Sequence, residues 1–373
     1  MTQIDLLDQE IDLELRASLE SLMAKFCSHS RLIALYDGDR SIADLLWDKV
    51  RLELGLAGIL VPEERGGAGL SAREAAVVME TLGRYAAATP FLTSSIVATT
   101  LLLLAQSPLV SEIASGERTV ALVVPFSTSP VDEIPAFDRD DAGRISGMAC
   151  SVAGAIEADT LILPVRSGAR LDLCVIPATE AVITPRVSLD MTRQVVDVSC
   201  EGIAATVIAE DAERILRRAI LTGAILLASE QVGVARWCLD TSVAYLKERR
   251  QFGQPLGGFQ ALKHRLADLY VGVENAGAAA RYAAVALSVG DPEVEVAAAV
   301  AQAFCSDIAV LAGEEAVQLH AGMGMTWEHP AHLYLKRAKA DQIAFGNAGQ
   351  FREWLASLVD LPFAAARPQQ GIN

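Results

Sequence analysis

The period of the hydrophobic pattern changes twice along this chain, and this change restricts the possible folds more than any other feature. Up to about residue 106, apolar residues recur every three or four positions, as in DLLWDKVRLELGLAGIL, which is typical of amphipathic helices. Between about 117 and 210, short β-branched runs such as TVALVVPF and LDLCVIPA appear instead, bounded by Pro, Gly and Asp. From residue 211 the helical spacing returns and continues nearly to the end.

This order predicts an α+β protein in three parts: an N-terminal helical domain at 1–117, a middle β-domain at 118–210 and a C-terminal helical bundle at 211–373. No helix-length pattern separates the strands of the middle part. Mostly antiparallel strands, as a small barrel or sandwich, are therefore favoured over a parallel βαβ sheet. No GxGxxG motif follows a strand, so a Rossmann domain has no support.

Local signals place several helix ends. Ser71 with Glu74 three residues later predicts a capping box just after VPEERGGAGLS. Asp291 followed by Pro292 predicts the start of a later helix, because Asp caps helices and Pro fits their first turn. The glycines of AGMGM at 321–325 predict where that helix ends.

Composition restricts the partners and the compartment. A net charge of -16 and a pI near 4.8 do not favour binding to nucleic acid, which requires a concentrated positive surface. The N-terminal stretch is acidic and amphipathic, unlike a signal peptide, and the longest apolar run, IVATTLLLLA, is too short to cross a bilayer. No CxxC pair occurs, so we expect reduced core cysteines in a cytoplasmic protein: Cys27, Cys150, Cys174, Cys200, Cys238 and Cys305.

The most specific motifs lie in two C-terminal segments, YLKERRQFGQPLGGFQALKHRLADLY at 245–270 and AVQLHAGMGMTWEHPAHLYLKRAKA at 316–340. Both closely resemble the acyl-CoA dehydrogenase family, and VPEERGGAGLS adds a third match. The resemblance covers nearly the whole chain. It implies an N-terminal helical domain, a middle β-domain and a C-terminal four-helix bundle, which are the parts that the hydrophobic pattern predicts independently.

The resemblance also implies a reaction. Members of the family oxidise an acyl-CoA thioester to the 2,3-enoyl thioester. A carboxylate removes the α-proton while hydride leaves the β-carbon for N5 of FAD, and electron-transfer flavoprotein is the expected acceptor of the electrons. The α-proton is only weakly acidic, even beside a thioester that is hydrogen-bonded at its carbonyl, so a strong base is needed.

The resemblance implies that this chain carries one half of a shared flavin site. In the family FAD lies across a subunit interface, and the neighbouring subunit holds its pyrophosphate and adenine. An Arg fork suits phosphate oxygens, and Gly allows close backbone approach. The residues that match this half are Arg249, Gln251, Phe252, Gly253 and Gln260, followed by Gln318, Leu319, His320, Ala321 and Gly322.

Two features of this half leave another interpretation open. Ala321 stands where the family carries a Gly, although it keeps a small side chain. Arg249 could pair with Glu248 or Asp268 instead of a phosphate, and the glycines could only cap a helix.

The half that cradles the isoalloxazine ring departs from the family. VVPFSTSPVDE at 123–133 stands where members carry Thr-Glu-Pro and then Gly-Ser-Asp. Ser151, Val152 and Ala153 stand where a Trp-Ile-Thr stretch normally contacts the flavin. An aromatic wall and a hydroxyl donor are therefore both missing.

The catalytic base is missing from its two usual places. Phe345 occupies the Glu position of a Tyr-Glu-Gly-Thr stretch, and Gly223 occupies the alternative position on the first helix of the bundle. Glu230 and Glu213 on the same helix, and Asp341 before the Phe, remain as carboxylates, but a solvated or capping role is favoured for each. No catalytic residue is assigned.

The TWEHPAHLYLKRA stretch suggests a subfamily-specific turn and helix. His320, His329 and His332 lie close together in the sequence, but no HExxH spacing exists, so no metal is expected. Trp327 is expected to pack against the protein. The basic residues of the following helix are expected near its C-terminal end or facing a phosphate: Lys336, Arg337 and Lys339.

Three functions fit these observations. The favoured one is a partner subunit without the catalytic Glu, as in bacterial heterotetramers of paired paralogues that act on steroid or other bulky acyl-CoAs. The second is a self-sufficient homo-oligomeric dehydrogenase with a displaced base, either Glu230 or Asp341. The third is a flavin-free scaffold, or non-redox chemistry on an acyl thioester.

Overall fold

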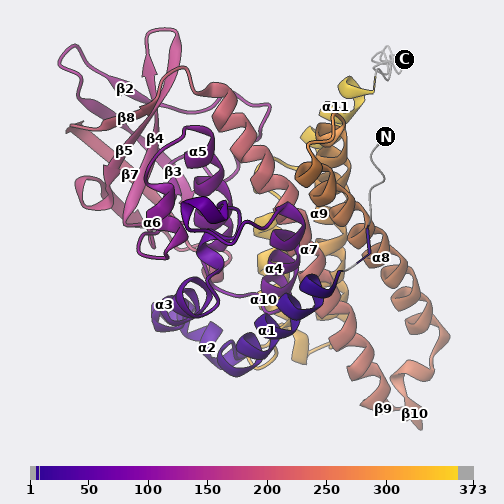
Figure 1. Cartoon of the computed structure of the whole chain (residues 1–373). Coiled ribbons are helices and arrows are strands. Elements are labelled where there is room, and N and C mark those ends of the chain that lie inside the picture. The colour runs from indigo at the N-terminus through magenta and orange to yellow at the C-terminus, as the bar shows by residue number, and fades with distance from the viewer. Residues whose placement is uncertain (1–5, 8, 360–373) are drawn as a thin grey trace, which may run out of the picture.

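The computed structural model in Figure 1 describes residues 6, 7 and 9–359 and confirms the helix–strand–helix order. The first part is helical, with its predicted capping box in place: Ser71 N–H donates to the Glu74 carboxylate, and Arg73 N–H donates to Ser71 Oγ. Its helices are α1 (Glu10–Phe26), α2 (His29–Ala34), α3 (Ser41–Asp48), α4 (Ala72–Arg84), α5 (Thr99–Leu104) and α6 (Val110–Ala114). Shorter helical segments are η1 (Leu35–Asp37), η2 (Lys49–Glu53), η3 (Leu56–Gly58), η4 (Glu63–Arg65) and η5 (Phe91–Ala98).

The apolar run IVATTLLLLA is a helix inside the fold, as its length predicts. The π-helical segment η5 continues directly into α5, and every residue of η5 is buried. Two longer helices, α7 (Glu213–Glu248) and α9 (Val294–Leu319), are also long and apolar enough to cross a membrane by length and composition alone. Their most apolar windows are 94% and 67% buried in the protein, so packing within the fold accounts for their hydropathy.

The middle part is a single, mostly antiparallel sheet with the strand order β6-β7-β3-β2-β4-β5-β8, and β1 also pairs with β4. Among the described pairs, β1–β4 and β2–β4 are parallel and the other pairs of this sheet are antiparallel. The strands are β1 (Val120–Leu122), β2 (Phe137–Arg139), β3 (Ile145–Ala153), β4 (Thr160–Ser167), β5 (Arg170–Pro177), β6 (Val182–Pro185), β7 (Val195–Ile203) and β8 (Thr206–Ala209). Short helical turns are η6 (Ala178–Glu180) and η7 (Met191–Arg193).

The third part is a helical bundle built on one long helix, α7 (Glu213–Glu248). A two-stranded hairpin, β9 (Arg250–Gln251) and β10 (Gln254–Pro255), and the turn η8 (Leu256–Gly258) connect it to α8. The remaining elements are α8 (Gln260–Val289), α9 (Val294–Leu319), η9 (Met323–Met325), α10 (Ala331–Asp341) and α11 (Ala348–Leu358).

Two predictions made at single residues need correction. The helix expected to start at Asp291 and Pro292 begins at Val294, because Asp291 Oδ1 accepts the backbone N–H of Glu293 and forms a turn before the helix. Five of the six cysteines are buried as expected, but Cys150 is exposed because it lies at an irregularity in β3. None of the six forms a disulfide.

The N-terminal part is fastened to the bundle where α4 crosses α7. A Cβ atom on Gly83 of α4 would lie 2.2 Å from the carbonyl oxygen of Glu230, and one on Gly233 of α7 would lie 1.9 Å from that of Glu80. Each helix therefore needs a glycine where the backbone of the other helix touches it.

We predict that Gly233→Ala lowers the free energy of unfolding by about 1–3 kcal/mol, because the helices have to separate to admit the methyl group. The matched control is Gly277→Ala on α8, where a Cβ would meet only the side-chain ends of Arg236 and Arg281 and that of Val232, at 3.5 Å or more. The control should be neutral or stabilising by up to about 1 kcal/mol, since Ala is the better helix former. Equal urea midpoints for both variants would contradict the close crossing.

Candidate functional site

The hairpin between α7 and α8 projects beyond the body of the protein, at the lower right of Figure 1. Its two turn residues both have positive φ, +50° at Phe252 and +81° at Gly253, as in a type I′ turn. This conformation suits Gly but is uncommon for a bulky residue such as Phe. The Phe252 side chain is 88% exposed, so the turn holds an aromatic ring out in solvent.

The base of this hairpin carries cationic groups and open backbone donors. Arg249 and Arg250 are exposed, and neither forms an ion pair within residues 9–359, so the pairing of Arg249 with Glu248 or Asp268 is not realised. Helix α8 starts beside them, and Phe259 provides no side-chain cap. The backbone N–H groups of Leu262 and Lys263 donate to the Phe259 carbonyl, whereas those of Gln260 and Ala261 have no acceptor among the described residues. These two donors lie at the positive end of the helix dipole, which is an arrangement that binds anions.

The second predicted segment, 318–322, lies at the C-terminal end of α9. Gln318, Ala321 and Gly322 are exposed, whereas Leu319 and His320 are 6% and 2% exposed. The side chains of Leu319 and His320 face the interior, so only their backbone could meet an outside ligand. Ala321 has a φ of +52°, the left-handed region that a Gly adopts without strain.

The structure brings the two segments to the same end of the bundle. Tyr245 lies one turn before Arg249 on α7, and its ring centroid is 4.4 Å from that of His320. Gln251 is exposed on the hairpin, and Gln260 is the exposed first residue of α8. We call residues 249–260 and 318–322 together the clamp.

The two positions aligned with the base, and Ala153 among those aligned with the flavin ring, meet at one small pocket in the N-terminal third of α7. A Cβ on Gly223 would lie 2.8 Å from Cζ of Phe345, so the two usual base positions are in contact. Ala153 also lines this pocket, while Ser151 is exposed and Val152 is buried in the sheet core. The lining residues are Thr93, Val97, Leu122, Val124, Phe126, Ala153 and Phe345.

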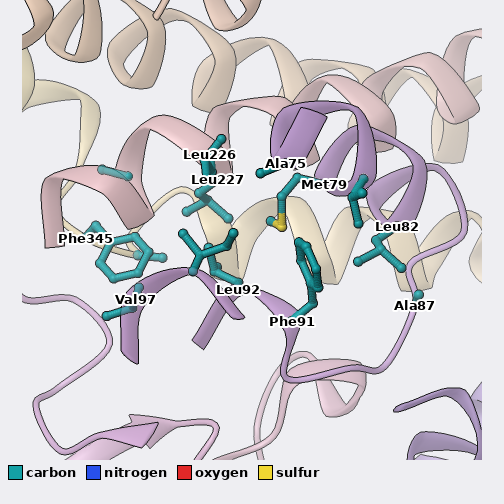
Figure 2. Close-up of a cluster of buried hydrophobic side chains, with 14 of the residues drawn as sticks. Ala75, Met79, Leu82, Ala87, Phe91, Leu92, Val97, Leu226, Leu227 and Phe345 are labelled. Atoms are coloured by element: carbon teal, nitrogen blue, oxygen red, sulfur yellow. The ribbon is translucent and has the colours of Figure 1, made fainter. Parts of the chain in front are cut away.

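Two phenylalanines fill this pocket. The Phe345 N–H donates to the Phe126 carbonyl at 2.8 Å, and their rings meet edge-on with centroids 5.1 Å apart. Figure 2 shows Phe345 beside Val97, at one end of a continuous apolar cluster that reaches Phe91. The remaining cavity is about 20 Å³, enough for roughly one water molecule. Its lining has no carboxylate and no room for an acyl chain.

The carboxylates Glu230 and Asp341 are neither solvated nor capping, contrary to expectation, but belong to a buried ion network. Glu230 accepts from Arg193 at 2.5 Å and from Arg337 at 2.9 Å, and Asp341 accepts from Arg193 at 2.6 Å. Arg337 also lies 2.9 Å from Asp190. Arg337 is 1% exposed and faces this network, so it is not the helix-end or phosphate-facing residue that the sequence predicts.

The protonation state of Asp341 decides whether the charges of this buried network balance. Two arginines face three carboxyl groups, and burial followed by the charge of Glu230 raises the pKa of Asp341 well above its usual range. A protonated Asp341 leaves two positive and two negative charges. Glu213, the third base candidate, is exposed and pairs with Arg217 on the next turn of α7.

A much larger cleft, about 1050 Å³, lies outside the filled pocket beside the N-terminal end of α7. Arg214 and Arg218 line it without an ion-pair partner among the described residues. Two helices hold the nearby loop that contains Asp132: Gln350 of α11 donates to the Asp132 carboxylate, and Arg217 of α7 donates to the Asp132 carbonyl.

The histidines of the TWEHPAHLYLKRA stretch lie among aromatic rings. Trp327 contacts Tyr36 as expected for a packed residue but remains 55% exposed, and the Lys336 ammonium lies over both rings. Lys339 is paired with Glu314 at the surface. In the part of the chain that the structure describes, no three His, Cys, Asp or Glu side chains are arranged to hold a metal.

Sequence reasoning missed Phe126, Asp190 and Arg193. Phe126 was noted only as part of a missing signature, although one large aromatic in a loop of small residues is a signal for a filled site. Asp190 and Arg193 carry no local pattern, because only the fold brings η7 to α7 and α10.

We predict that Asp341→Asn and Glu230→Gln differ sharply in stability. Asn mimics the protonated acid, whereas Gln leaves two buried arginines short of a carboxylate, which costs about 3–5 kcal/mol. Because the pKa of Asp341 is raised in the folded state, its contribution to stability is complete below its ordinary pKa and is lost as pH rises toward the folded value. Asp341→Asn should therefore be at least as stable as wild type in urea unfolding at neutral pH. A loss as large as that of Glu230→Gln would contradict the protonated state.

Comparison with known proteins identifies the fold. Residues 10–108 match the acyl-CoA dehydrogenase N-terminal domain, and residues 213–357 match the acyl-CoA dehydrogenase C-terminal domain. Among solved structures, the ChsE4-ChsE5 complex from Mycobacterium tuberculosis aligns over 96% of this chain and 100% of its own, with a TM-score of 0.84 at 23% identity. A variant of the Tcur3481-Tcur3483 steroid ACAD aligns over 94% of this chain and 98% of its own, with a TM-score of 0.82 at 25% identity.

Similarity to curated proteins establishes the family. The acyl-CoA dehydrogenase IpdE2 of Mycolicibacterium smegmatis is 35% identical over 87% of this chain and 91% of its own length. The acyl-CoA dehydrogenase FadE34 of Mycobacterium tuberculosis is 33% identical over 86% of this chain, a match that spans 42% of that longer protein. This chain belongs to the acyl-CoA dehydrogenase family of FAD-dependent oxidoreductases.

Proposed function

We propose that this chain is the FAD-clamping subunit of a hetero-oligomeric acyl-CoA dehydrogenase, in which a paralogous subunit provides the ring cradle and the catalytic base. The complex removes hydrogen from Cα and Cβ of an acyl-CoA thioester and forms the 2,3-enoyl-CoA. The observation that carries this proposal is the filling of this chain's own ring-and-base pocket by Phe126 and Phe345.

Distance supports the need for a second chain. Gly223, at the filled pocket, and Glu248, next to Arg249, are 25 residues apart on the unbroken helix α7. At 1.5 Å per residue this separation is about 38 Å, which exceeds the length of an extended FAD molecule. One flavin therefore cannot reach both the clamp and the ring pocket of a single chain. A second copy would bring only another filled pocket, which supports a different polypeptide as the partner.

The chemistry of the clamp fits the ADP part of FAD. The guanidinium of Arg249 can donate two hydrogen bonds to phosphate oxygens, and the first N–H groups of α8 add donors at a positive helix end. The exposed backbone at 321–322 allows a dinucleotide to approach closely. When bound, FAD supplies the hydride acceptor. This chain's own residues bind the cofactor, orient it and close the subunit interface over it.

The relatives support a paired assembly and a bulky substrate. The ChsE4-ChsE5 complex and the Tcur3481-Tcur3483 enzyme are each named for two chains, and the second is named as a steroid ACAD. We therefore propose a steroid or similarly bulky acyl-CoA as the substrate, held in the partner because the pocket of this chain has no room for it. Electron-transfer flavoprotein as acceptor and a cytoplasmic location complete the proposal.

The geometry opposes the alternative of a self-sufficient dehydrogenase. Its base would be Glu230 or Asp341, but Arg193 pairs with both carboxylates and Arg337 also pairs with Glu230. A carboxylate that is protonated, or neutralised by two arginines, is a weak acceptor for an α-proton.

We predict that this chain purified alone is colourless and does not dehydrogenate acyl-CoA. Co-expression with its paralogue should give a yellow complex with the flavin absorption band and with turnover. Asp341→Asn in that complex should keep its turnover, because Asp341 is not the base. Yellow protein that turns over an acyl-CoA without a partner would contradict the proposal.

A further inference from the structure

Five ring side chains form a continuous ladder through the C-terminal bundle. Ring centroids are 4.4 Å apart between Tyr245 and His320, 4.1 Å between His320 and His329, and 6.4 Å between His329 and Trp237. Trp237 then stacks face to face on Tyr334, with centroids 3.6 Å apart and planes 2° from parallel. The rings come from α7, α9, α10 and the turn before α10, so the ladder links elements that are distant in the sequence.

The ladder joins the N-terminal domain to both segments of the clamp. At one end, the Tyr334 hydroxyl donates to the backbone carbonyl of Arg84, next to the C-terminal end of α4, at 2.8 Å. At the other end, the Tyr245 carbonyl accepts the backbone N–H of Arg249 at 2.9 Å. His320, the neighbour of Tyr245 in the ladder, is itself part of the segment 318–322.

The two imidazoles are fixed in orientation and are neutral. His320 Nδ1 donates to the Ala316 carbonyl at 2.7 Å, and His329 Nδ1 accepts the backbone N–H of Ala331 at 3.2 Å. Burial lowers the pKa of His320, and burial with the nearby histidines lowers the pKa of His329 to about 4. The neutral rings lie tilted by 33° with centroids 4.1 Å apart, without the repulsion that two imidazolium ions would have.

We propose that Tyr245, His320 and His329 are positioning residues for the flavin, setting the separation between the Arg249 guanidinium and the backbone at 321–322. This inference rests on the proposed clamp function. Between residues 249–260 and 318–322, both of which are fully described, no hydrogen bond or ion pair is present, and the Tyr245 ring against His320 is a side-chain contact that links them in addition to the packing of α7 on α9. If the two segments of the clamp moved independently, ordering them when FAD binds would cost free energy and weaken the affinity for FAD.

The test compares Tyr245→Ala with Tyr245→Phe in the flavinated complex of this chain and its paralogue. Titration of the flavin-depleted complex with FAD gives Kd, and thermal unfolding is measured in parallel. Loss of a stacked aromatic pair should raise Kd by about fivefold for Tyr245→Ala, whereas Phe keeps the ring and should stay within about twofold of wild type. His329→Ala should weaken FAD binding in the same direction, and it carries the test if Tyr245→Ala does not assemble.

Two further variants separate the possible failures. Leu19→Ala in α1 removes a fully buried side chain far from the clamp, so it should lower the unfolding temperature and leave Kd unchanged. A Kd that follows stability in all variants, Leu19→Ala included, would overturn the positioning role. If Arg249→Ala weakens FAD binding while Tyr245→Ala behaves like Tyr245→Phe, the ladder proposal fails and the clamp stands. If Arg249→Ala also leaves Kd unchanged, the clamp proposal itself fails.

Discussion

Helix α7 runs unbroken for 36 residues. The filled pocket, the ion network, the crossing with α4, the ring ladder and the clamp all lie on this helix or against it. The helix fixes their order and their separation. Burial along most of its length, close contact with α4 and side chains from η7 and α10 keep it straight and in place. In chain order, Gly223 contacts Phe345, Glu230 belongs to the ion network and Gly233 lies at the α4 crossing. Trp237 and Tyr245 of the ring ladder follow, and Arg249 of the clamp caps the C-terminal end of the helix.

This arrangement places the predicted clamp and the filled ring-and-base pocket at different positions along one helix. At the filled pocket, the rings of Phe126 and Phe345 pack against each other. The Arg193 guanidinium lies 5.5 Å from the Phe126 ring centroid. The ion network thus packs directly behind the filled pocket. At the other end, Arg249 and Arg250 of the hairpin and Gln318, Ala321 and Gly322 after α9 are exposed. This division supports the proposal that the chain functions as one subunit of an assembly.

The change in hydrophobic period was enough to predict the architecture, because helices and strands bury their faces at different spacings. The Ser71–Glu74 capping box was also predictable, since a local rule determines it. The nine-residue strand β3 was not recognised: ISGMACSVA contains a Gly, and bulges interrupt its alternation.

In the candidate site, too, local motifs were predictable from the sequence, whereas contacts between distant segments were not. Motif spacing predicted the two segments of the clamp, which the fold brings to the same end of the bundle, but it could not show that Leu319 and His320 turn inward, because that depends on Tyr245 and His329 from other elements. Aligned positions correctly brought Gly223, Ala153 and Phe345 to one place. The contribution of Phe126 and the pairing of Asp341 with Arg193 arise only when loops and helices distant in the sequence meet.

The central claim is that this chain grips a flavin that another polypeptide cradles, and the ratio of flavin to protein in the purified complex tests it most directly. FAD released by denaturation is quantified by absorbance, and the two chains are quantified by amino-acid analysis. We expect one FAD for each pair of this chain and its paralogue, because the ring pocket of this chain is filled by Phe126 and Phe345. Two FAD molecules for each pair would mean that the pocket filled by Phe126 and Phe345 opens to bind flavin, and would contradict the account.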